Sequence, residues 1–207
     1  MEAVLDVYER PYDPLYPVVN LDESPKQLIS EVRKSFMDSQ GVLHQDYEYS
    51  REGVADIYMI LEALAGRREV HIEDDHSSKT YAKIIAHIAE QMYPEAKRIT
   101  IVEDNLSAHR LAALYEIFEA DRARSIIKRL EIVRTPKHGS WLNIAESELS
   151  ILIRHGLKKR TPCKKTLIQD AKAWYDRRNE KEKKVNWRFK TTDARIKLKR
   201  LYPAFNT

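Results

Sequence analysis

The sequence predicts an α/β fold, a mixed five-stranded sheet flanked by helices, with extra helices toward the C-terminus. Five short segments are rich in β-branched and aromatic residues, and the later ones are separated by segments with helical spacing of apolar residues. The predicted strands and helices follow one another in the order β-β-β-α-β-α-β-α. Three consecutive strands favour an antiparallel meander, whereas each strand–helix–strand unit gives a parallel pair. The sheet is therefore expected to contain both kinds of pairing.

The predicted strands are bounded by turns or by acidic residues. They cover residues 16–22, 54–64, 68–73, 98–103 and 130–135. Gly66 and Arg67 supply the turn between the second and third strands, and the fourth, RITIVE, is too rich in Ile and Val for a helix. The string SPKQ after the first strand has the form of a capping box with proline at the first helical position. It predicts a short helix or turn at residues 24–27.

The predicted helices have apolar residues three or four positions apart. They cover residues 78–92, 109–130, 140–155, 166–178 and 192–201. In the first of them Tyr81 and Ile88 share one face, as the helical period requires. The three tryptophans, Trp141, Trp174 and Trp187, are expected in the core.

Length and composition limit the classes to which the protein can belong. At 207 residues and 43% apolar composition, the chain fits one globular domain. A single cysteine, Cys163, excludes an internal disulfide and a cysteine-based metal cluster, so a reducing cytoplasm is the expected location. No run approaches the roughly 18 apolar residues of a membrane span, and the acidic, proline-broken N-terminus is unlike a signal peptide. We expect residues 1–160 to form the core and residues 161–207 a basic helical extension of the same domain.

The net charge of +4 conceals a strong asymmetry. Residues 151–207 contain 18 Lys and Arg against 5 Asp and Glu, whereas the rest of the chain contains 18 basic and 27 acidic residues. A basic segment behind an acidic body favours a polyanionic partner, with carboxylates retained for another purpose. A solvated lysine-rich helical surface would give the same composition, so charge alone does not decide between them.

Three acidic residues occur where the predicted topology would bring them together. Asp22 ends the first strand, Asp104 follows the fourth, and Glu146 lies in the helix after the fifth. If the first and fourth strands are parallel neighbours, Asp22 and Asp104 leave the sheet side by side at the edge where open α/β sheets bind ligands. Crowded carboxylates raise one another's pKa, and hard divalent cations such as Mg²⁺ reverse that penalty. Two such ions about 4 Å apart can catalyse an in-line phosphoryl displacement.

Spacing alone leaves other interpretations of these acids open. Asp22 could be a turn or capping residue, and Asp104 with Asn105 could form a strand-to-helix turn closed by Asx hydrogen bonds. Glu146 could be a solvated helix residue. Three neighbouring acids compete for the same roles: Glu23, Glu103 and Glu148.

Five strings stand out when the chain is taken as a whole. They are VVNLDESPKQL, DYEYSREG, IVEDNLSAH, RTPKHGSWLNIAESELS and NWRFKTTDARIKLKRLYP, and they run from Val18 to Pro203. In this order they resemble transposases of the insertion-sequence-630 branch of the Tc/mariner superfamily. PKHGSWLNIAE is long and unusual in composition, which makes chance a poor explanation. The resemblance implies a ribonuclease-H-like fold and a DDE endonuclease that uses two Mg²⁺ or Mn²⁺ ions.

The resemblance places the family's catalytic triad on three residues of this chain. Asp22 matches in the string LDE, Asp104 in DN-x-x-x-H and Glu146 in LN-x-x-E. These acids would hold the metal ions and carry catalysis. The implied reaction is hydrolysis of a phosphodiester at the transposon end, followed by attack of the freed 3′-hydroxyl on target DNA, as in cut-and-paste transposition.

Three further residues of the family strings are secondary candidates. His109 would either contact DNA or water near the scissile phosphate or cap the helix after Asp104. Asn143 is expected to hydrogen-bond backbone near the metal site. Glu148 lacks the leucine–asparagine context of Glu146 at the right distance and ranks below it.

The resemblance also implies DNA as the partner, both transposon ends and a TA-containing target, with a homodimer joining two ends. No membrane partner is expected, and the location would be the bacterial cytoplasm at the nucleoid. The basic stretches at residues 154–165 and 181–200 are candidates for phosphate contact, which makes affinity fall steeply with salt. The individual candidates are Lys137, His138, Arg154, Lys158, Lys159, Arg160, Lys164 and Lys165.

The resemblance also implies N-terminal DNA-recognition modules, for which we expect no counterpart in this sequence. The first candidate catalytic aspartate is residue 22, which leaves no room for helix-turn-helix modules before it. Metal-dependent nicking could survive without them. Two other functions stay open: a catalytically silent DNA-binding or regulatory remnant, and a different ribonuclease-H-like enzyme such as a resolvase or hybrid nuclease. The three acids argue against the first, and the string TPKHGSWLN argues against the second.

Overall fold

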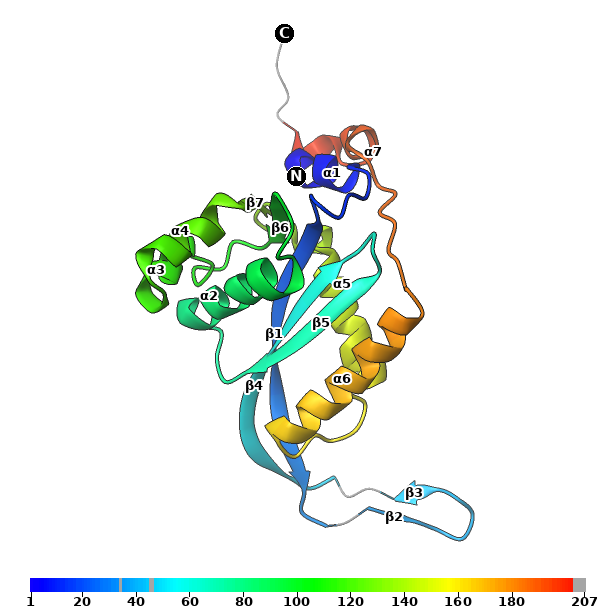
Figure 1. Cartoon of the computed structure of the whole chain (residues 1–207). Helices are drawn as coiled ribbons and strands as arrows, with labels where there is room; N and C mark the ends of the chain where they lie inside the picture. Colours follow the sequence, from blue (N-terminus) through cyan, green and yellow to red (C-terminus); the bar gives the residue numbers. More distant parts are fainter. Residues whose placement is uncertain (34, 45–46, 203–207) are drawn as a thin grey trace.

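A five-stranded mixed sheet in the order β5-β4-β1-β6-β7 forms the centre of the molecule (Figure 1). The computed structural model describes residues 1–33, 35–44 and 47–202. The strands of the sheet are β1 (Val18–Glu31), β4 (Tyr49–Glu62), β5 (Arg67–Glu73), β6 (Ile99–Glu103) and β7 (Leu130–Arg134). β1 pairs antiparallel with β4 and parallel with β6, β4 pairs antiparallel with β5, and β6 pairs parallel with β7. The predicted mixed sheet, with Asp22 and Asp104 on parallel neighbours, is confirmed.

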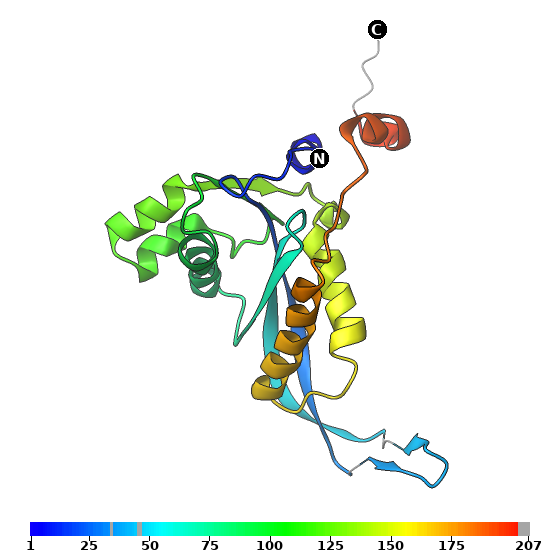
Figure 2. The ribbon, with the colours of Figure 1, turned by 45° about the vertical axis from the view of Figure 1, so that its right-hand side comes forward.

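Helices cover both faces of this sheet (Figure 2). The α-helices are α1 (Glu2–Tyr8), α2 (Ser78–His87), α3 (Leu114–Ile117), α4 (Ala120–Lys128), α5 (Ile144–Ile151), α6 (Lys164–Glu180) and α7 (Thr191–Lys197). Shorter turns are the π-helical η1 (Ile88–Met92) and η4 (Leu152–Gly156) and the 3-10 turns η2 (Leu111–Ala113), η3 (Ser140–Leu142) and η5 (Lys199–Leu201). Helices α2, α3 and α4 share one apolar core with Leu21 and Tyr58, whereas α5 and α6 share a second with Ile57 and Met59. Among the described residues, no helix is both long enough and apolar enough to cross a membrane.

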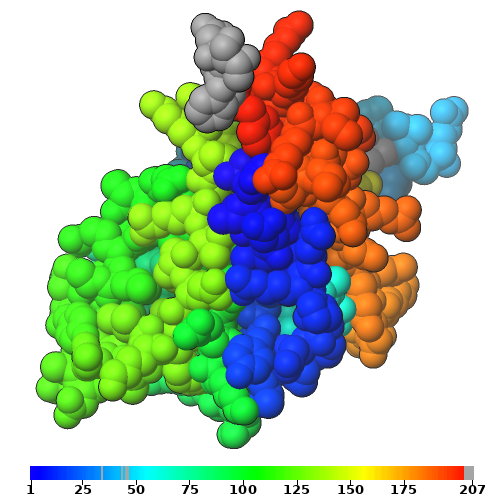
Figure 3. All heavy atoms as spheres, turned by 90° about the horizontal axis from the view of Figure 1, so that it is seen from above, coloured from blue at the N-terminus to red at the C-terminus, as the bar shows by residue number. Residues whose placement is uncertain are grey.

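Helices α1 and α7, from opposite ends of the chain, lie against each other at one end of the sheet (Figure 3). The guanidinium of Arg195 donates to the Glu2 carboxylate at 2.8 and 3.0 Å, and the Thr191 hydroxyl lies 3.0 Å from Asp6 Oδ1. The sequence does not predict α1. Its seven residues make two turns, too few for periodicity to separate a helix from a turn.

Strands β1 and β4 extend well beyond the part of the sheet that has neighbours on both sides. Each contains 14 residues, but β6 pairs with β1 only as far as Asn20, and β5 pairs with β4 only from Asp56 onward. The rest is a two-stranded ribbon that leads to a small hairpin of β2 (Phe36–Met37) and β3 (Leu43–His44) (Figure 1). The hairpin projects away from the body of the molecule.

The ribbon shows that the predicted helix or turn at residues 24–27 is wrong. These residues continue β1 and pair with residues 54–57 of β4. Pro25 is tolerated because β1 has an open edge there, beyond the last residue paired with β6. Cross-strand pairing thus overrides the local capping pattern, which is a weaker preference.

Two further expectations need correction. The predicted helix at residues 109–130 is broken into η2, α3 and α4, because Phe118 adopts extended backbone with φ −126° and ψ 155°. Trp141 does not lie in the core as expected but is 44% exposed, packed edge-on and face-on against Phe189 and Trp187 at ring distances of 5.8 and 6.4 Å. Trp174 is buried as expected.

Candidate active site

Asp22 and Asp104 lie on adjacent parallel strands. The register of β1 and β6 ends with Asn20 paired to Val102. Continued by two residues, this register sets Asp22 beside Asp104, because two parallel strands advance together. Asp22 stands within β1, and Asp104 is the first residue after β6. The structure therefore brings together the two aspartates that the topology predicted as neighbours.

Asp22 faces helix α5, which carries Glu146. Asp22 lies opposite Met59, whose side chain belongs to the core beneath α5 and α6, and opposite residues share a face of the sheet. Glu146 is in the first turn of α5 and is exposed. Burial raises the pKa of Asp22 to about 7, with repulsion from Glu23, Asp104 and Glu146 adding to it. Asp104 and Glu146 thus both act on Asp22 electrostatically.

Asn143 ties helix α5 to strand β1. Its Nδ2 donates to the carbonyl of Leu21 at 2.8 Å, and its Oδ1 accepts the N–H of Ala145 at 3.2 Å as the N-cap of the helix. Leu21 precedes Asp22 and Ala145 precedes Glu146. One buried side chain therefore positions the first turn of α5 against the strand that carries the first aspartate. The hydrogen bond to backbone expected for Asn143 is present.

Asp104 forms an Asx turn and still presents an accessible carboxylate. Its Oδ1 accepts the N–H of Leu106 at 2.8 Å and lies 3.1 Å from Nδ1 of His109. The hydrogen bond from His109 is the main reason that the pKa of Asp104 lies below its ordinary value. Its side chain is 41% exposed. Both of these contacts fall on Oδ1, which leaves Oδ2 for a ligand. The Asx turn at Asp104 is therefore compatible with a catalytic role for this residue.

His109 is an internal partner of two carboxylates. It is 2% exposed, its Nε2 lies 3.2 Å from Glu23 Oε2, and its ring stacks on Tyr81 at 4.7 Å. Burial lowers the pKa of His109, but the hydrogen bonds to Asp104 and Glu23 outweigh it and raise the pKa to about 10. The ligand atoms of Glu23, Asp104 and His109 lie within 4.8 Å of one another. An imidazolium that donates both N–H groups has no lone pair for a metal ion, so His109 acts as an internal cation between two carboxylates.

Two of the competing acids are engaged elsewhere. Glu103 is fully buried and accepts the Tyr81 hydroxyl at 2.8 Å. Glu148 is also buried, and its Oε1 lies 2.9 Å from Nε of Arg68 and 2.6 Å from Nε of Arg178. Both carboxylates are enclosed by the protein: Glu148 by its two arginines, and Glu103 by Tyr81 on one oxygen, with the other oxygen 3.5 Å from Nε of Arg134. On α5, Glu146 is therefore the acid left to face a ligand, and Glu148 is a structural residue.

The predicted DNA-binding residues fall in two places. Lys137 and His138 are exposed in the loop between β7 and α5, close in sequence to the N-cap of α5. The others lie between residues 154 and 165, at and after the end of η4. The N–H of Ile29 donates to the carbonyl of Thr161 at 2.8 Å, so this basic segment lies beside the ribbon part of β1. Ile29 is seven residues beyond Asp22, which is about 23 Å along a strand.

The basic side chains near Thr161 differ in their contacts. Lys158, Lys159 and Lys165 are exposed. Arg160 donates to the carbonyl of Glu48 at 3.1 Å, and Lys164 lies 2.7 Å from Asp74 Oδ1. The segment is thus anchored by some of its basic residues, while others face solvent.

The arrangement of sheet and helices is ribonuclease-H-like and is shared with solved structures of the Mos1 transposase. The Mos1 mariner paired-end complex with Mn matches with a TM-score of 0.57 at 17% identity, over 88% of this chain and 54% of that chain. The Mos1 strand transfer complex matches with a TM-score of 0.56 at 14% identity, over 88% and 56%. The chain thus spans about half the length of these structures. None of the curated proteins compared with the chain matches it.

A family model agrees with the fold. Residues 17–168 match the DDE superfamily endonuclease model, a range that contains Asp22, Asp104 and Glu146. The chain belongs to the DDE superfamily of endonucleases. The predicted DDE endonuclease family and ribonuclease-H-like fold are confirmed, and the assignment to the insertion-sequence-630 branch of the Tc/mariner superfamily stays a prediction from the sequence strings.

Proposed function

We propose that the chain is the catalytic domain of a cut-and-paste transposase in which Asp22, Asp104 and Glu146 hold divalent metal ions. The observation that carries the proposal is the meeting of these acids at one edge of the sheet, with the pKa of Asp22 raised to about 7. Burial and like charge both penalise an ionised carboxylate. A cation removes the penalty, and strongly perturbed acids are typical of functional sites.

The donor set fits Mg²⁺ or Mn²⁺. The three candidate ligands are carboxylates, which hard cations prefer, and the neighbouring imidazole of His109 is occupied by Asp104 and Glu23. When bound, a pair of such ions supplies an activated water or 3′-hydroxyl and stabilises the leaving oxygen of an in-line displacement. Two ions are part of this proposal.

The residues around the triad hold it ready for ligands. His109 keeps Asp104 ionised and, together with the N–H of Leu106, fixes its Oδ1. The positive charge of His109 also offsets part of the negative charge of Glu23. Asn143 sets the position of the helix that carries Glu146. Precise placement of such groups is what positioning contributes to catalysis.

DNA is the proposed substrate. The Mos1 structures are a paired-end complex and a strand transfer complex, and a basic segment lies beside β1 in this chain. About 23 Å along the strand corresponds to roughly seven base steps of 3.4 Å. A duplex that runs along β1 from Asp22 would reach Lys158 and Lys159 about seven base pairs away. Two copies acting on two ends, a TA-containing target and a location at the nucleoid complete the proposal.

The test is nicking of supercoiled plasmid with Mg²⁺, with Mn²⁺ or with chelator. Wild type is compared with Asp104→Ala and Glu146→Ala, and with Glu95→Ala as an exposed acid outside the site. We expect cleavage that needs metal and both site acids and is unaffected in the Glu95 variant. If wild type binds DNA but cuts no better than Asp104→Ala, the protein is a silent regulatory remnant. Preference for RNA–DNA hybrids or branched junctions would indicate another ribonuclease-H-like enzyme.

A further inference from the structure

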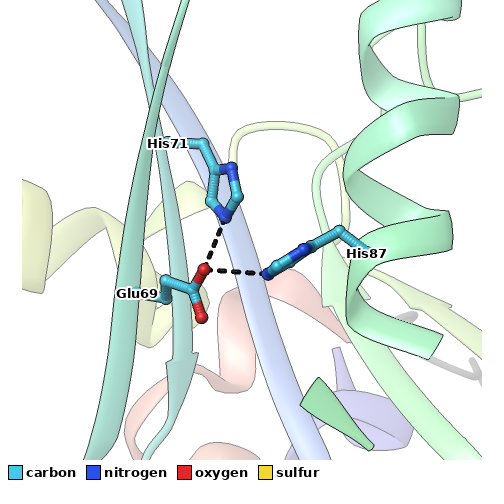
Figure 4. Close-up of side chains that lie close together, drawn as sticks. All are labelled: Glu69, His71 and His87. Carbon is cyan, nitrogen blue, oxygen red and sulfur yellow. Dashed lines mark hydrogen bonds and ion pairs between the residues drawn. The ribbon is translucent and has the colours of Figure 1, made fainter. Parts of the chain in front are cut away.

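A second group of metal-ligating side chains lies apart from the acids described above. Glu69, His71 and His87 converge with ligand atoms within 4.8 Å of one another (Figure 4). Nε2 of His71 and Nε2 of His87 each lie 2.8 Å from the same oxygen, Oε1 of Glu69. The two imidazole rings meet edge to face at 4.5 Å. Each side chain is 23–29% exposed, so an ion can reach them from solvent.

The scaffold beneath the group is well packed. Glu69 and His71 are two residues apart on β5 and so point to the same face of the strand. Val70 and Ile72 point to the other face and are buried in the core under α6. His87 is the last residue of α2, a helix whose apolar face is buried in the other core. The three donors are therefore presented by two elements that are each fixed by packing.

We propose that Glu69, His71 and His87 form a binding site for Zn²⁺ or a similar transition-metal cation that links edge strand β5 to helix α2. Zn–N distances of about 2.0–2.1 Å place tetrahedral ligand atoms roughly 3.3 Å apart. Two of the three separations here are 2.8 Å. Small side-chain rotations that open them by about 0.5 Å would admit the ion, with solvent supplying the fourth ligand.

The donor chemistry separates this site from the carboxylate site. Two imidazoles and one carboxylate suit Zn²⁺, Ni²⁺ or Cu²⁺, whereas Mg²⁺ prefers oxygen ligands. Glu69 offers one carboxylate oxygen that both imidazoles contact. The ion would replace the protons that His71 and His87 now share with Glu69.

Thermal unfolding of the full chain, with affinity tag removed and metals stripped, tests the proposal. The Asp104→Ala variant serves as background, so that binding at the DDE site is weakened and the two sites are distinguished. At a Zn²⁺ concentration a hundredfold above the dissociation constant, we expect Tm to rise by about 5–10 °C. Mg²⁺ at the same concentration should give no such rise. Co²⁺ should give the visible absorption of a four-coordinate site.

Two variants and one matched control decide the outcome. His71→Asn and His87→Gln should each abolish the Zn²⁺ shift and the Co²⁺ spectrum, whereas His155→Gln, at an exposed histidine elsewhere, should keep both. In a protein that keeps Asp104, the single substitution His87→Gln should leave the rate of plasmid nicking at the wild-type value. An equal Zn²⁺ shift in all variants, or none in the background protein, would show that the three side chains form only an internal hydrogen-bonded cluster.

Discussion

Removing the Asn143 side chain should weaken both the fold and cleavage. Asn143→Ala deletes the N-cap of α5 and the hydrogen bond from Nδ2 to the carbonyl of Leu21. Both bonds are buried, so water does not replace them readily. The variant should therefore unfold more easily, and Glu146 should lose its fixed position relative to Asp22.

The size of the effect follows from the two hydrogen bonds. Loss of an N-cap costs about 1 kcal/mol. A buried carbonyl deprived of one partner costs about 1–2 kcal/mol more. The free energy of unfolding should therefore fall by about 2–3 kcal/mol, which lowers Tm by roughly 4–12 °C for a chain of this size.

Urea unfolding and plasmid nicking measure the two consequences separately. Asn143→Ser is the matched control, because serine keeps the cap but cannot reach the Leu21 carbonyl with an amide. It should recover about 1 kcal/mol of stability while cleavage stays low. If Asn143→Ala changed stability by less than about 0.5 kcal/mol, or cleaved DNA at the wild-type rate while folded, the tether between α5 and β1 would not have the role assigned to it.

Three further predictions follow from the site and the basic segment. In chelator, Asp22→Asn should be more stable than wild type at pH 8. The raised pKa of Asp22 stabilises the wild-type fold fully below about pH 4, and this stabilisation is lost as the pH rises through about 7. Equal urea midpoints of the two proteins at pH 8 would contradict this prediction. Glu148→Ala should lower the free energy of unfolding by about 3–5 kcal/mol, since it leaves the buried Arg68 without its carboxylate partner. Glu146→Ala should change the free energy of unfolding by less than about 0.5 kcal/mol. If chemical unfolding gave similar free energies for the two variants, the assignment of the two glutamates would be wrong. Lys158→Ala with Lys159→Ala should reduce the slope of log affinity against log salt by about 0.9 for each phosphate that the protein no longer neutralises. Fluorescence anisotropy with labelled duplex measures that slope, and no change relative to an exposed-lysine control, Lys97→Ala, would exclude an interaction of these lysines with the DNA backbone.

Much of the fold is predictable because strand order follows from local signals. Three sheet strands before helix α2 and two strand–helix units after them determine which pairs are antiparallel and which are parallel. The length of β1 is not predictable, because residues 24–27 have a helix-start pattern and become strand only by pairing with β4. The break at Phe118 likewise depends on packing around α3 and α4.

Some features of the candidate site are likewise predictable from the sequence, and others depend on tertiary contacts. Asp22 and Asp104 can be placed side by side from the sequence because parallel neighbours advance together, although the expected end of the first strand at Asp22 is wrong, since β1 continues to Glu31 by pairing with β4. The choice between Glu146 and Glu148 needs the tertiary partners of Glu148, since Arg68 is far away in the sequence and no local pattern couples them. His109 belongs to a recognisable motif, but its second partner, Glu23, lies 86 residues away.

The narrowing of the sheet has a consequence for how backbone amides exchange with solvent deuterium. Asp22 lies two residues past the last residue of β1 that pairs with β6, where the five-stranded sheet narrows to β5, β4 and β1, and the two-stranded ribbon begins beyond Pro25, which lies opposite Asp56. Isolated two-strand pairs are only marginally stable. Amides of the ribbon should therefore exchange by local opening, and those of residues 18–21 only by global unfolding. The hairpin end of the protein can thus adapt to a bound partner while the strand carrying the first aspartate stays closed.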